Sequence, residues 1–226
     1  VAASVENASG ARMSSDAAFV AELAQALAAA MGTLISDITR QTAATSVIVQ
    51  IDEPMVPMVL AGSLPTASGY SRHWPRPAAE VMALLTQFVS DIAGDVWLHC
   101  CADSPPIELL RGTGATGVSI AASAIADIDL DLIGQHIDAG KTLALGVISP
   151  ADWGRPQAQL IDLAVATSER LRERLSFSEQ QWGSALVLTA TCGLAGASVL
   201  QASTVMSALN TAAASLSGGR ITPEHE

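Results

Sequence analysis

A histidine and two cysteines at the end of an apolar run are the residues best suited to chemistry. Residues 95–98 are apolar and β-prone, and His99, Cys100 and Cys101 follow them directly. Because side chains alternate along a strand, we expect His99 and Cys101 on one face and Cys100 on the other. Imidazole and thiolate groups are ligands that zinc prefers. This stretch is therefore a candidate metal-binding segment.

Cys192 is the remaining cysteine, and it also ends an apolar run, at 186–191, just before Gly193. If both runs are strands of one sheet with aligned ends, His99, Cys101 and Cys192 form a three-ligand set for zinc. The alternative is structural, because free cysteines commonly behave as small buried hydrophobes and a histidine at a strand end is often a core residue. The spacing leaves both interpretations open.

The composition excludes several classes of function. The chain has 226 residues, half of them hydrophobic, and a net charge of −11 with no basic patch. An acidic chain of this kind is not expected to bind nucleic acid or an anionic membrane surface. No uninterrupted apolar stretch reaches the roughly 20 residues of a membrane span. We expect a cytoplasmic protein with no membrane partner, and its oligomeric state is not indicated.

The elements that position these residues are alternating strands and helices. Apolar, β-prone runs predict strands at 46–51, 95–98, 117–120, 142–147 and 186–191. Apolar residues at helical spacing predict helices at 15–38, 78–93, 107–110, 127–139, 157–175 and 198–216. Strands apolar on both faces that alternate with helices favour a parallel sheet covered by helices.

Three local expectations accompany this pattern. Ser15 is expected to cap the first helix, because a serine hydroxyl can accept from a free backbone N–H. Residues 54–77 are rich in proline, glycine and serine and are expected to form a long loop, in which His73 and Trp74 are either solvated or cover a ligand. His136 is expected on a polar helix face, with no chemical role.

Polar and titratable residues gather just after the predicted strands. They are Asp52 and Glu53, the His99–Cys101 stretch, Ser149 and Cys192. In a (β/α)₈ barrel this position is the rim that carries the active site. Five strands cannot close such a barrel, so the barrel interpretation requires strands from elsewhere.

The segments at these strand ends resemble the motifs of cobalamin-independent methionine synthases, and they occur in the family order. The family sequences "IQIDEP", "HMC", "ISIE", "GVYDIHSP" and "DCGL" correspond, in that order, to residues 49–54, 99–101, 117–120, 146–150 and 191–194, the fourth in a shortened form. In that family the motifs end strands four to eight of a C-terminal (β/α)₈ TIM barrel. The resemblance implies that residues 1–226 form a single, partial barrel domain that lacks the first three strands.

The resemblance also implies a chemistry, which is methyl transfer from a polyglutamylated methyltetrahydrofolate to the thiol of homocysteine. Zinc binds the thiol and stabilises the thiolate nucleophile. By resemblance, His99, Cys101 and Cys192 are zinc ligands and Asp52 holds the substrate amino group. Glu53 shares the substrate-binding motif, although it can also be read as a simple rim carboxylate.

Two positions depart from the family pattern. The glutamate of "ISIE", a fourth zinc ligand in the family, is Ala121 here, and the histidine of "YDIHSP", a proton donor, aligns with Ile148. Losing a general acid typically costs about 10²- to 10⁴-fold in rate. The sequence therefore predicts a diverged methyltransferase that acts on a small thiol, and the alternative is a non-catalytic relative that binds a metal or a ligand.

Overall fold

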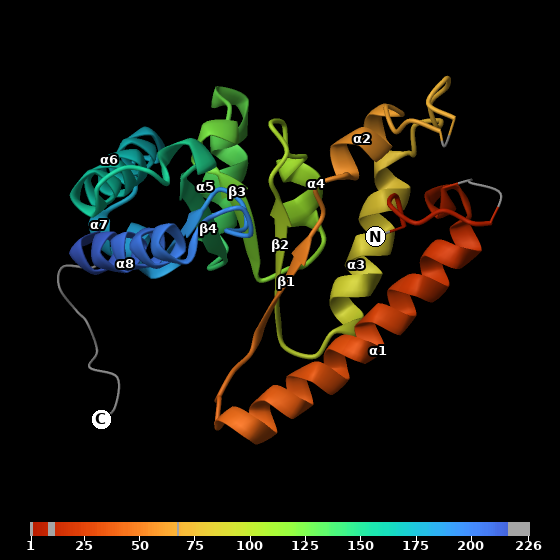
Figure 1. Ribbon diagram of the computed structural model, residues 1–226, viewed down its shortest axis with the longest axis horizontal. Helices are drawn as coiled ribbons and strands as arrows, with labels where there is room; N and C mark the ends of the chain where they lie inside the picture. Colours follow the sequence, from red (N-terminus) through yellow and green to blue (C-terminus); the bar gives the residue numbers. More distant parts are fainter. Residues whose placement is uncertain (1, 9–11, 67, 217–226) are drawn as a thin grey trace. The chain divides into compact units, whose positions relative to one another are not determined.

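The computed structural model describes residues 2–8, 12–66 and 68–216, which pack as two compact units, Val1–Gly117 and Val118–Glu226 (Figure 1). Both units combine helices with parallel strands. The predicted α/β class is therefore confirmed, and all five predicted strands are present. That residues 1–226 form one partial barrel domain stays a prediction.

The first unit is built on two parallel strands, β1 (Ile48–Asp52) and β2 (Asp95–Cys100). Their register runs from Ile48 opposite Asp95 to Asp52 opposite His99. The chain turns into β2 at Gly94, whose φ of 116° lies in a region that residues with a Cβ rarely adopt. The helices of this unit are η1 (Met13–Ser15), α1 (Ala17–Thr42), α2 (Val56–Ala61), α3 (Ala78–Asp91) and α4 (Ile107–Gly112).

Helix α1 is long and largely exposed. Asp16 caps it by accepting a 3.0 Å hydrogen bond from the Phe19 N–H. The expectation that Ser15 is the cap was wrong, because the Ser15 hydroxyl donates instead to the Arg12 carbonyl at 2.8 Å. Of the 26 residues of α1, Ala28 alone is buried, and the helix packs beside α3 (Figure 1).

Among the described helices, α1 alone is long and apolar enough to cross a membrane by length and composition, with a mean hydropathy of 1.6 over an 18-residue stretch. A core helix of a soluble protein and a signal sequence meet the same criterion. Glu22 and Gln25 interrupt its apolar run.

The second unit has a more completely buried core. β4 (Thr142–Ile148) pairs in parallel with β5 (Leu186–Ala190), and β4 is buried from Leu143 onward. The Ala121 end of β3 (Gly117–Ala121) lies beside β4 at Gly146. The helices of this unit are η2 (Ala122–Ala124), η3 (Asp127–Asp129), α5 (Leu130–Asp138), η4 (Pro150–Asp152), α6 (Gln157–Leu175), α7 (Glu179–Ala185) and α8 (Val199–Leu216).

Helices α6 and α8 lie side by side in this unit and bury small and branched residues against each other and the strands (Figure 1). Trp182 of α7 is 1% exposed and donates its indole N–H to the Ser168 hydroxyl of α6 at 2.9 Å. This hydrogen bond satisfies a polar group that would otherwise be buried without a partner.

Two short α-helices and one side-chain environment differ from the sequence-based expectation. Helix α2 lies inside the expected long loop of residues 54–77, and α7 precedes β5. His136 is 2% exposed, so its expected place on a polar helix face was wrong. Its Nε2 lies 3.0 Å from the Thr142 carbonyl, a contact between α5 and β4 that a helical pattern alone does not reveal.

Candidate functional site

The parallel register of β1 and β2 brings two of the predicted motifs together in the first unit. Asp52 pairs with His99, and the backbone N–H of Glu53 donates to the His99 carbonyl at 2.8 Å. Asp52 is exposed, and its Oδ1 accepts a 2.9 Å hydrogen bond from the Gln50 amide. A carboxylate held in this way at a strand end can accept a hydrogen bond from a ligand amine or hydroxyl group.

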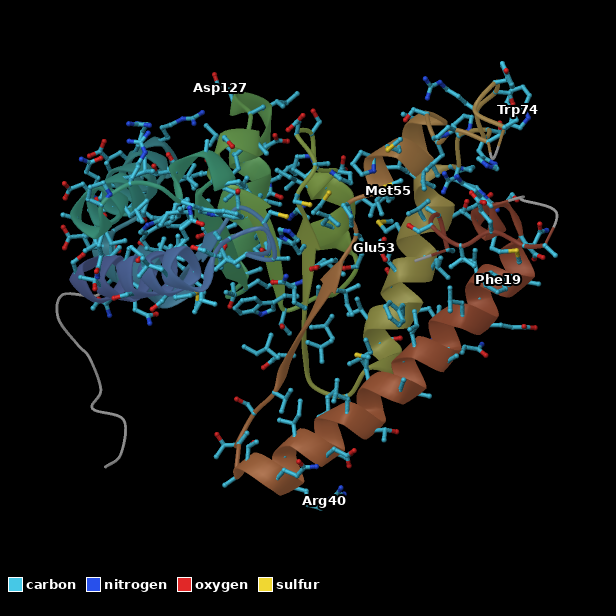
Figure 2. All side chains as sticks on the ribbon, viewed as in Figure 1. Phe19, Arg40, Glu53, Met55, Trp74 and Asp127 are labelled. Atoms are coloured by element: carbon cyan, nitrogen blue, oxygen red, sulfur yellow. The ribbon has the colours of Figure 1, made fainter. Side chains whose placement is uncertain are left out.

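Glu53 lies in a different environment from Asp52, although the two are neighbours in sequence. Its side chain lines an apolar cavity together with Met55 at the start of α2, and Figure 2 labels both residues where the chain leaves β1. Burial raises the pKa of Glu53 above its ordinary value, and the negative charge of Asp52 raises it further. The two acidic residues of the motif therefore lie in different environments, because Asp52 is exposed and Glu53 lines the apolar cavity.

The His-Cys-Cys segment is divided by the end of its strand. β2 ends at Cys100, so strand alternation places His99 and Cys100 but does not determine the direction of Cys101. His99 is 6% exposed and Cys100 fully buried, whereas Cys101 is exposed. Burial raises the pKa of the Cys100 thiol, with a further contribution from the charge of Glu53. Cys100 is thus a core residue, and the expected placement of His99 and Cys101 on one face stays a prediction.

The predicted departures from the family motifs occupy the ends of β3 and β4 in the second unit. Ala121 is the last residue of β3 and offers no ligand atom, and Ile148 ends β4 with no exposed surface. After Ile148, the Ser149 hydroxyl and backbone N–H both donate to Asp152 Oδ2, at 2.6 and 3.0 Å. This capping arrangement holds the strand end in a fixed conformation but supplies no general acid at position 148.

The charge of Asp152 is stabilised locally. Its partial burial opposes ionisation, but the hydrogen bonds from Ser149 and the nearby Arg155 outweigh burial and lower its pKa. Gln50 and Asp152 are the polar residues near the motifs that the sequence reasoning missed. Gln50 could have been found from its two-residue spacing to Asp52, which puts both side chains on one face of β1.

Cys192 lies in the turn that follows β5 and is exposed. The ligand set proposed from the sequence thus draws His99 and Cys101 from the first unit and Cys192 from the second. Within the residues that the structure describes, no three or more His, Cys, Asp or Glu side chains are grouped closely enough to hold a metal. The three-ligand zinc site stays a prediction.

The comparisons with known proteins leave the family open. No protein-family model matches this chain, and the search of curated proteins finds no significant relative.

Proposed function

We propose that this chain supplies strands four to eight of a (β/α)₈ barrel of the methionine-synthase type and acts as a zinc-dependent methyltransferase-like domain. It would transfer a methyl group to a small thiol such as homocysteine. One observation carries the proposal: every motif named in the sequence either includes or directly follows the carboxyl-terminal end of its own strand. Active sites of parallel α/β proteins are built at these strand ends.

The substrate side of the proposed site is the Asp52–His99 pair. Asp52 is exposed and oriented by Gln50, so it can accept a charge-assisted hydrogen bond from the amino group of an amino-acid thiol. Glu53 belongs to the same substrate-binding motif, and its backbone N–H fixes the two strand ends together. These contacts would orient the thiol toward the donors of His99 and Cys101.

The donor chemistry of the proposed ligands suits zinc. His99 offers an imidazole nitrogen, Cys101 and Cys192 offer sulfur, and Ala121 offers nothing, which would leave a position for a substrate thiol. Zinc, when bound, favours the thiolate form of such a thiol at neutral pH. The chain itself would position the substrate by holding its amino group on Asp52.

Methyl transfer would form a bond between the thiol sulfur and the methyl carbon and break the bond from that carbon to its donor nitrogen. The thiol proton is lost to solvent, and the departing nitrogen needs a proton. Ile148 cannot provide one, and the nearest acidic side chain along the chain, Asp152, is held ionised by Ser149 and Arg155. We therefore expect slow transfer from a methylfolate and faster transfer from a donor whose leaving group needs no proton.

The second candidate is a non-catalytic relative that binds a metal or a ligand, and the residues Ala121 and Ile148 favour it. For either function we propose a cytoplasmic location and small-molecule partners, with no nucleic acid and no membrane. The acidic net charge of −11 supports these two exclusions.

The metal content of the purified full chain tests the zinc assignment. We expect about one equivalent of zinc by mass spectrometry, as for a single tetrahedral site, and loss of that zinc in Cys101→Ser and Cys192→Ser. Cys100→Ala is the matched control, because the Cys100 side chain is buried, and it should retain zinc. A zinc-free wild type, or a Cys192→Ser variant with full zinc, contradicts the proposal.

Product formation separates the enzyme from the binding protein. The zinc-loaded chain is incubated with homocysteine and either methyltetrahydrofolate or a sulfonium methyl donor, and methionine is measured. Asp52→Asn should raise the KM for homocysteine, with a smaller effect on a thiol that lacks an amino group, because the lost interaction is with that group. Zinc retention without methionine from any donor supports the binding protein.

A further inference from the structure

One edge of the strand β1 has no partner in the first unit. Of the strands that the structure describes, β2 alone pairs with β1, along a register that runs from Ile48 to Asp52. In parallel pairing, each residue directs its N–H and C=O to one side of the strand, and successive residues alternate between the two sides. The side of β1 that faces away from β2 therefore carries its own row of backbone donors and acceptors.

A hydrogen bond at the end of β1 identifies the residues of this row. The Glu53 N–H donates to the His99 carbonyl of β2, so Glu53 faces β2. By alternation, the odd-numbered residues of β1 face β2, and the even-numbered residues face away. The outward row therefore consists of Ile48, Gln50 and Asp52. No other described backbone group donates to these three residues or accepts from them.

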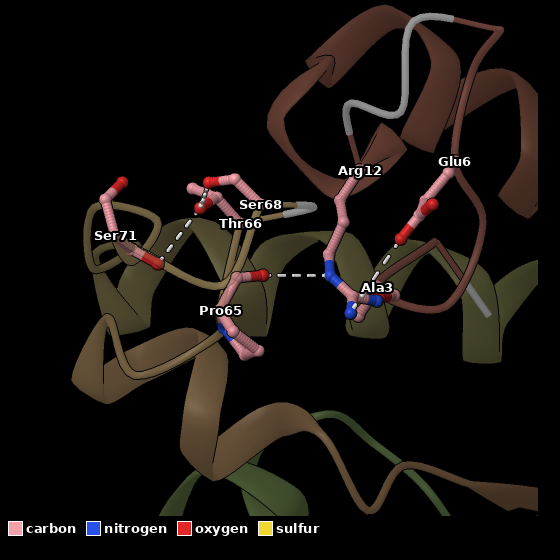
Figure 3. A network of polar contacts seen from close by, with 7 residues as sticks. All are labelled: Ala3, Glu6, Arg12, Pro65, Thr66, Ser68 and Ser71. Carbon is pink, nitrogen blue, oxygen red and sulfur yellow. Dashed lines mark hydrogen bonds and ion pairs between the residues drawn. The ribbon is translucent and has the colours of Figure 1, made fainter.

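Backbone carbonyls elsewhere in the first unit have side-chain partners. Arg12 donates to the carbonyls of Ala3 and Pro65, at 2.6 and 3.0 Å, as Figure 3 shows. The Thr66 hydroxyl donates in the same way to the Ser71 carbonyl at 3.1 Å. No described side chain does this for the outward row of β1, so the row is available to another molecule.

The chemistry of the row indicates what it binds. Proteins normally protect an edge strand with charged residues, proline or a bulge, because an unprotected edge pairs with a further strand. Residues 46–51 contain no charged residue and no proline, and their pairing with β2 is regular. The Ile48 side chain is 48% exposed. A row of alternating backbone donors and acceptors is matched by an extended peptide segment.

The sequence of β1 is complementary to itself in antiparallel pairing. When Gln50 lies opposite the Gln50 of a second copy, Ile48 lies opposite Asp52, so every outward residue meets an outward residue. The same register places Val49 opposite Ile51 on the other face of the strand. This gives two apolar cross-strand pairs, and no two like charges lie opposite each other.

We propose that a second copy of this chain pairs with the outward edge of β1, which gives an antiparallel β1–β1 dimer with Gln50 on the two-fold axis. Such an interface uses the same surface of both copies, so it closes at two and does not continue into a filament. The dimer goes beyond the proposed methyl transfer, because it uses the backbone of β1 and none of the zinc ligands. Its failure would leave the zinc content of the chain unchanged.

Sedimentation velocity of the full chain tests the proposal. Pairing over the five residues of β1 belongs to the small class of interfaces, below about 1,200 Å². We therefore expect a reversible dimer with a dissociation constant of roughly 1–100 μM. A chain that remains monomeric up to about 200 μM, twice the upper limit of that range, overturns the proposal. Growth into species larger than a dimer overturns it as well.

Two proline variants test which side of β1 is used. Gln50→Pro removes an outward N–H, which an edge strand tolerates, so the fold should be kept while the dimer weakens at least about tenfold. Ile51→Pro removes an N–H that faces β2 and should lower the unfolding temperature much more than Gln50→Pro does. A folded Gln50→Pro variant that dimerises like the wild type overturns the proposal. Equal destabilisation by the two prolines also overturns it, because the sides would then be wrongly assigned.

Charge variants at position 48 test the register. Ile48→Lys places an ammonium group opposite Asp52 of the second copy and should strengthen the dimer at least about twofold, whereas Ile48→Asp opposes two carboxylates and should weaken it at least about twofold. Ile128→Lys and Ile128→Asp are the controls, because Ile128 is 86% exposed in the second unit and the net charge changes equally. If Gln50→Pro does not fold, as judged by circular dichroism, these variants decide. Equal effects at positions 48 and 128 overturn the proposal.

Discussion

β1 and β4 are both parallel strands that end in a predicted motif, but their surroundings differ. β1 alternates between exposed and partly buried residues, and Ile48 is 48% exposed. β4 is buried from Leu143 to Ile148, and Leu145 has no exposed surface. The second unit thus buries β4 in its core, whereas the first unit leaves β1 and the helix α1 largely exposed.

The same contrast applies to the residues of chemical interest. In the first unit, Asp52 and Cys101 are exposed at the strand ends, and Glu53 lines a cavity. In the second unit, the corresponding strand ends carry Ala121 and Ile148. The first unit therefore carries most of the titratable motif residues, and the second unit contributes Cys192.

The largest expected effect comes from truncating the buried strand. Leu145→Ala should lower the free energy of unfolding by about 2–5 kcal/mol, because it removes fully buried methyl groups and leaves a cavity. Ile48→Ala should cost only about 0.5 kcal/mol, since half of that side chain is already in water. Denaturant unfolding of both variants measures the difference, and equal losses would show that the two strands are equally packed.

A smaller effect is expected at Gly146, where backbone segments approach closely. A Cβ at this position would lie 2.8 Å from the Thr191 Cα and 3.2 Å from the Ala121 Cα. Both neighbours are backbone atoms that cannot move aside without shifting β3 or the turn after β5. We expect Gly146→Ala to cost about 1–3 kcal/mol.

Gly154 provides the control for Gly146, because a Cβ there meets nothing within 4 Å. Gly154→Ala should leave the free energy of unfolding almost unchanged in the same denaturant experiment. A loss as large as that of Gly146→Ala would mean that the backbone freedom of glycine, and not close approach, explains both results.

The alkylation rates of the cysteines should show the difference between buried and exposed side chains within the His99–Cys101 segment. Burial raises the pKa of Cys100 and removes it from solvent, whereas Cys101 and Cys192 are exposed. At pH 8 without metal, iodoacetamide should modify Cys101 and Cys192 at least about tenfold faster than Cys100. Mass spectrometry of Cys101→Ser and Cys100→Ser variants separates the adjacent sites. Equal rates would contradict the assignment of Cys100 to the core.

Most of the elements could be predicted because their signals are local. Apolar periodicity placed all five strands and the long helices α3, α6 and α8 within a few residues. Helix α2 was missed because Pro57 and its proline-rich surroundings indicate a loop, although proline is acceptable in the first turn of a helix. Helix α7 has a usable sequence signal, the Ser178–Gln181 capping box.

The site was harder to predict, because it depends on contacts between elements. The strand ends of Asp52 and His99 could be aligned from the sequence, since parallel strands bring their carboxyl ends to one edge. The burial of His136 and the separate environments of Asp52 and Glu53 depend on the packing of α5 and of the α1–α3 helices, which no single segment encodes. The apolar cavity beside Glu53 likewise draws its lining from distant parts of the chain.

The smallest expected effect concerns Glu53 and sharpens the contrast with Asp52 beside it. Because burial raises the pKa of Glu53, the folded state binds this proton more tightly than the unfolded state does. Its contribution to stability is complete below the ordinary value of 4.5 and is lost as the pH rises through the raised value. Glutamine cannot ionise, so Glu53→Gln avoids this loss.

Thermal unfolding at pH 4 and pH 7 tests whether the contribution of Glu53 to stability falls as the pH rises. Glu53→Gln should unfold at nearly the same temperature as the wild type at pH 4 and at a higher temperature at pH 7. Glu108→Gln, on the exposed surface of α4, should match the wild type at both values. If the Glu53→Gln difference is the same at both pH values, the carboxylate costs nothing when it ionises. The cavity beside it would then be wetter and more polar than its apolar lining indicates.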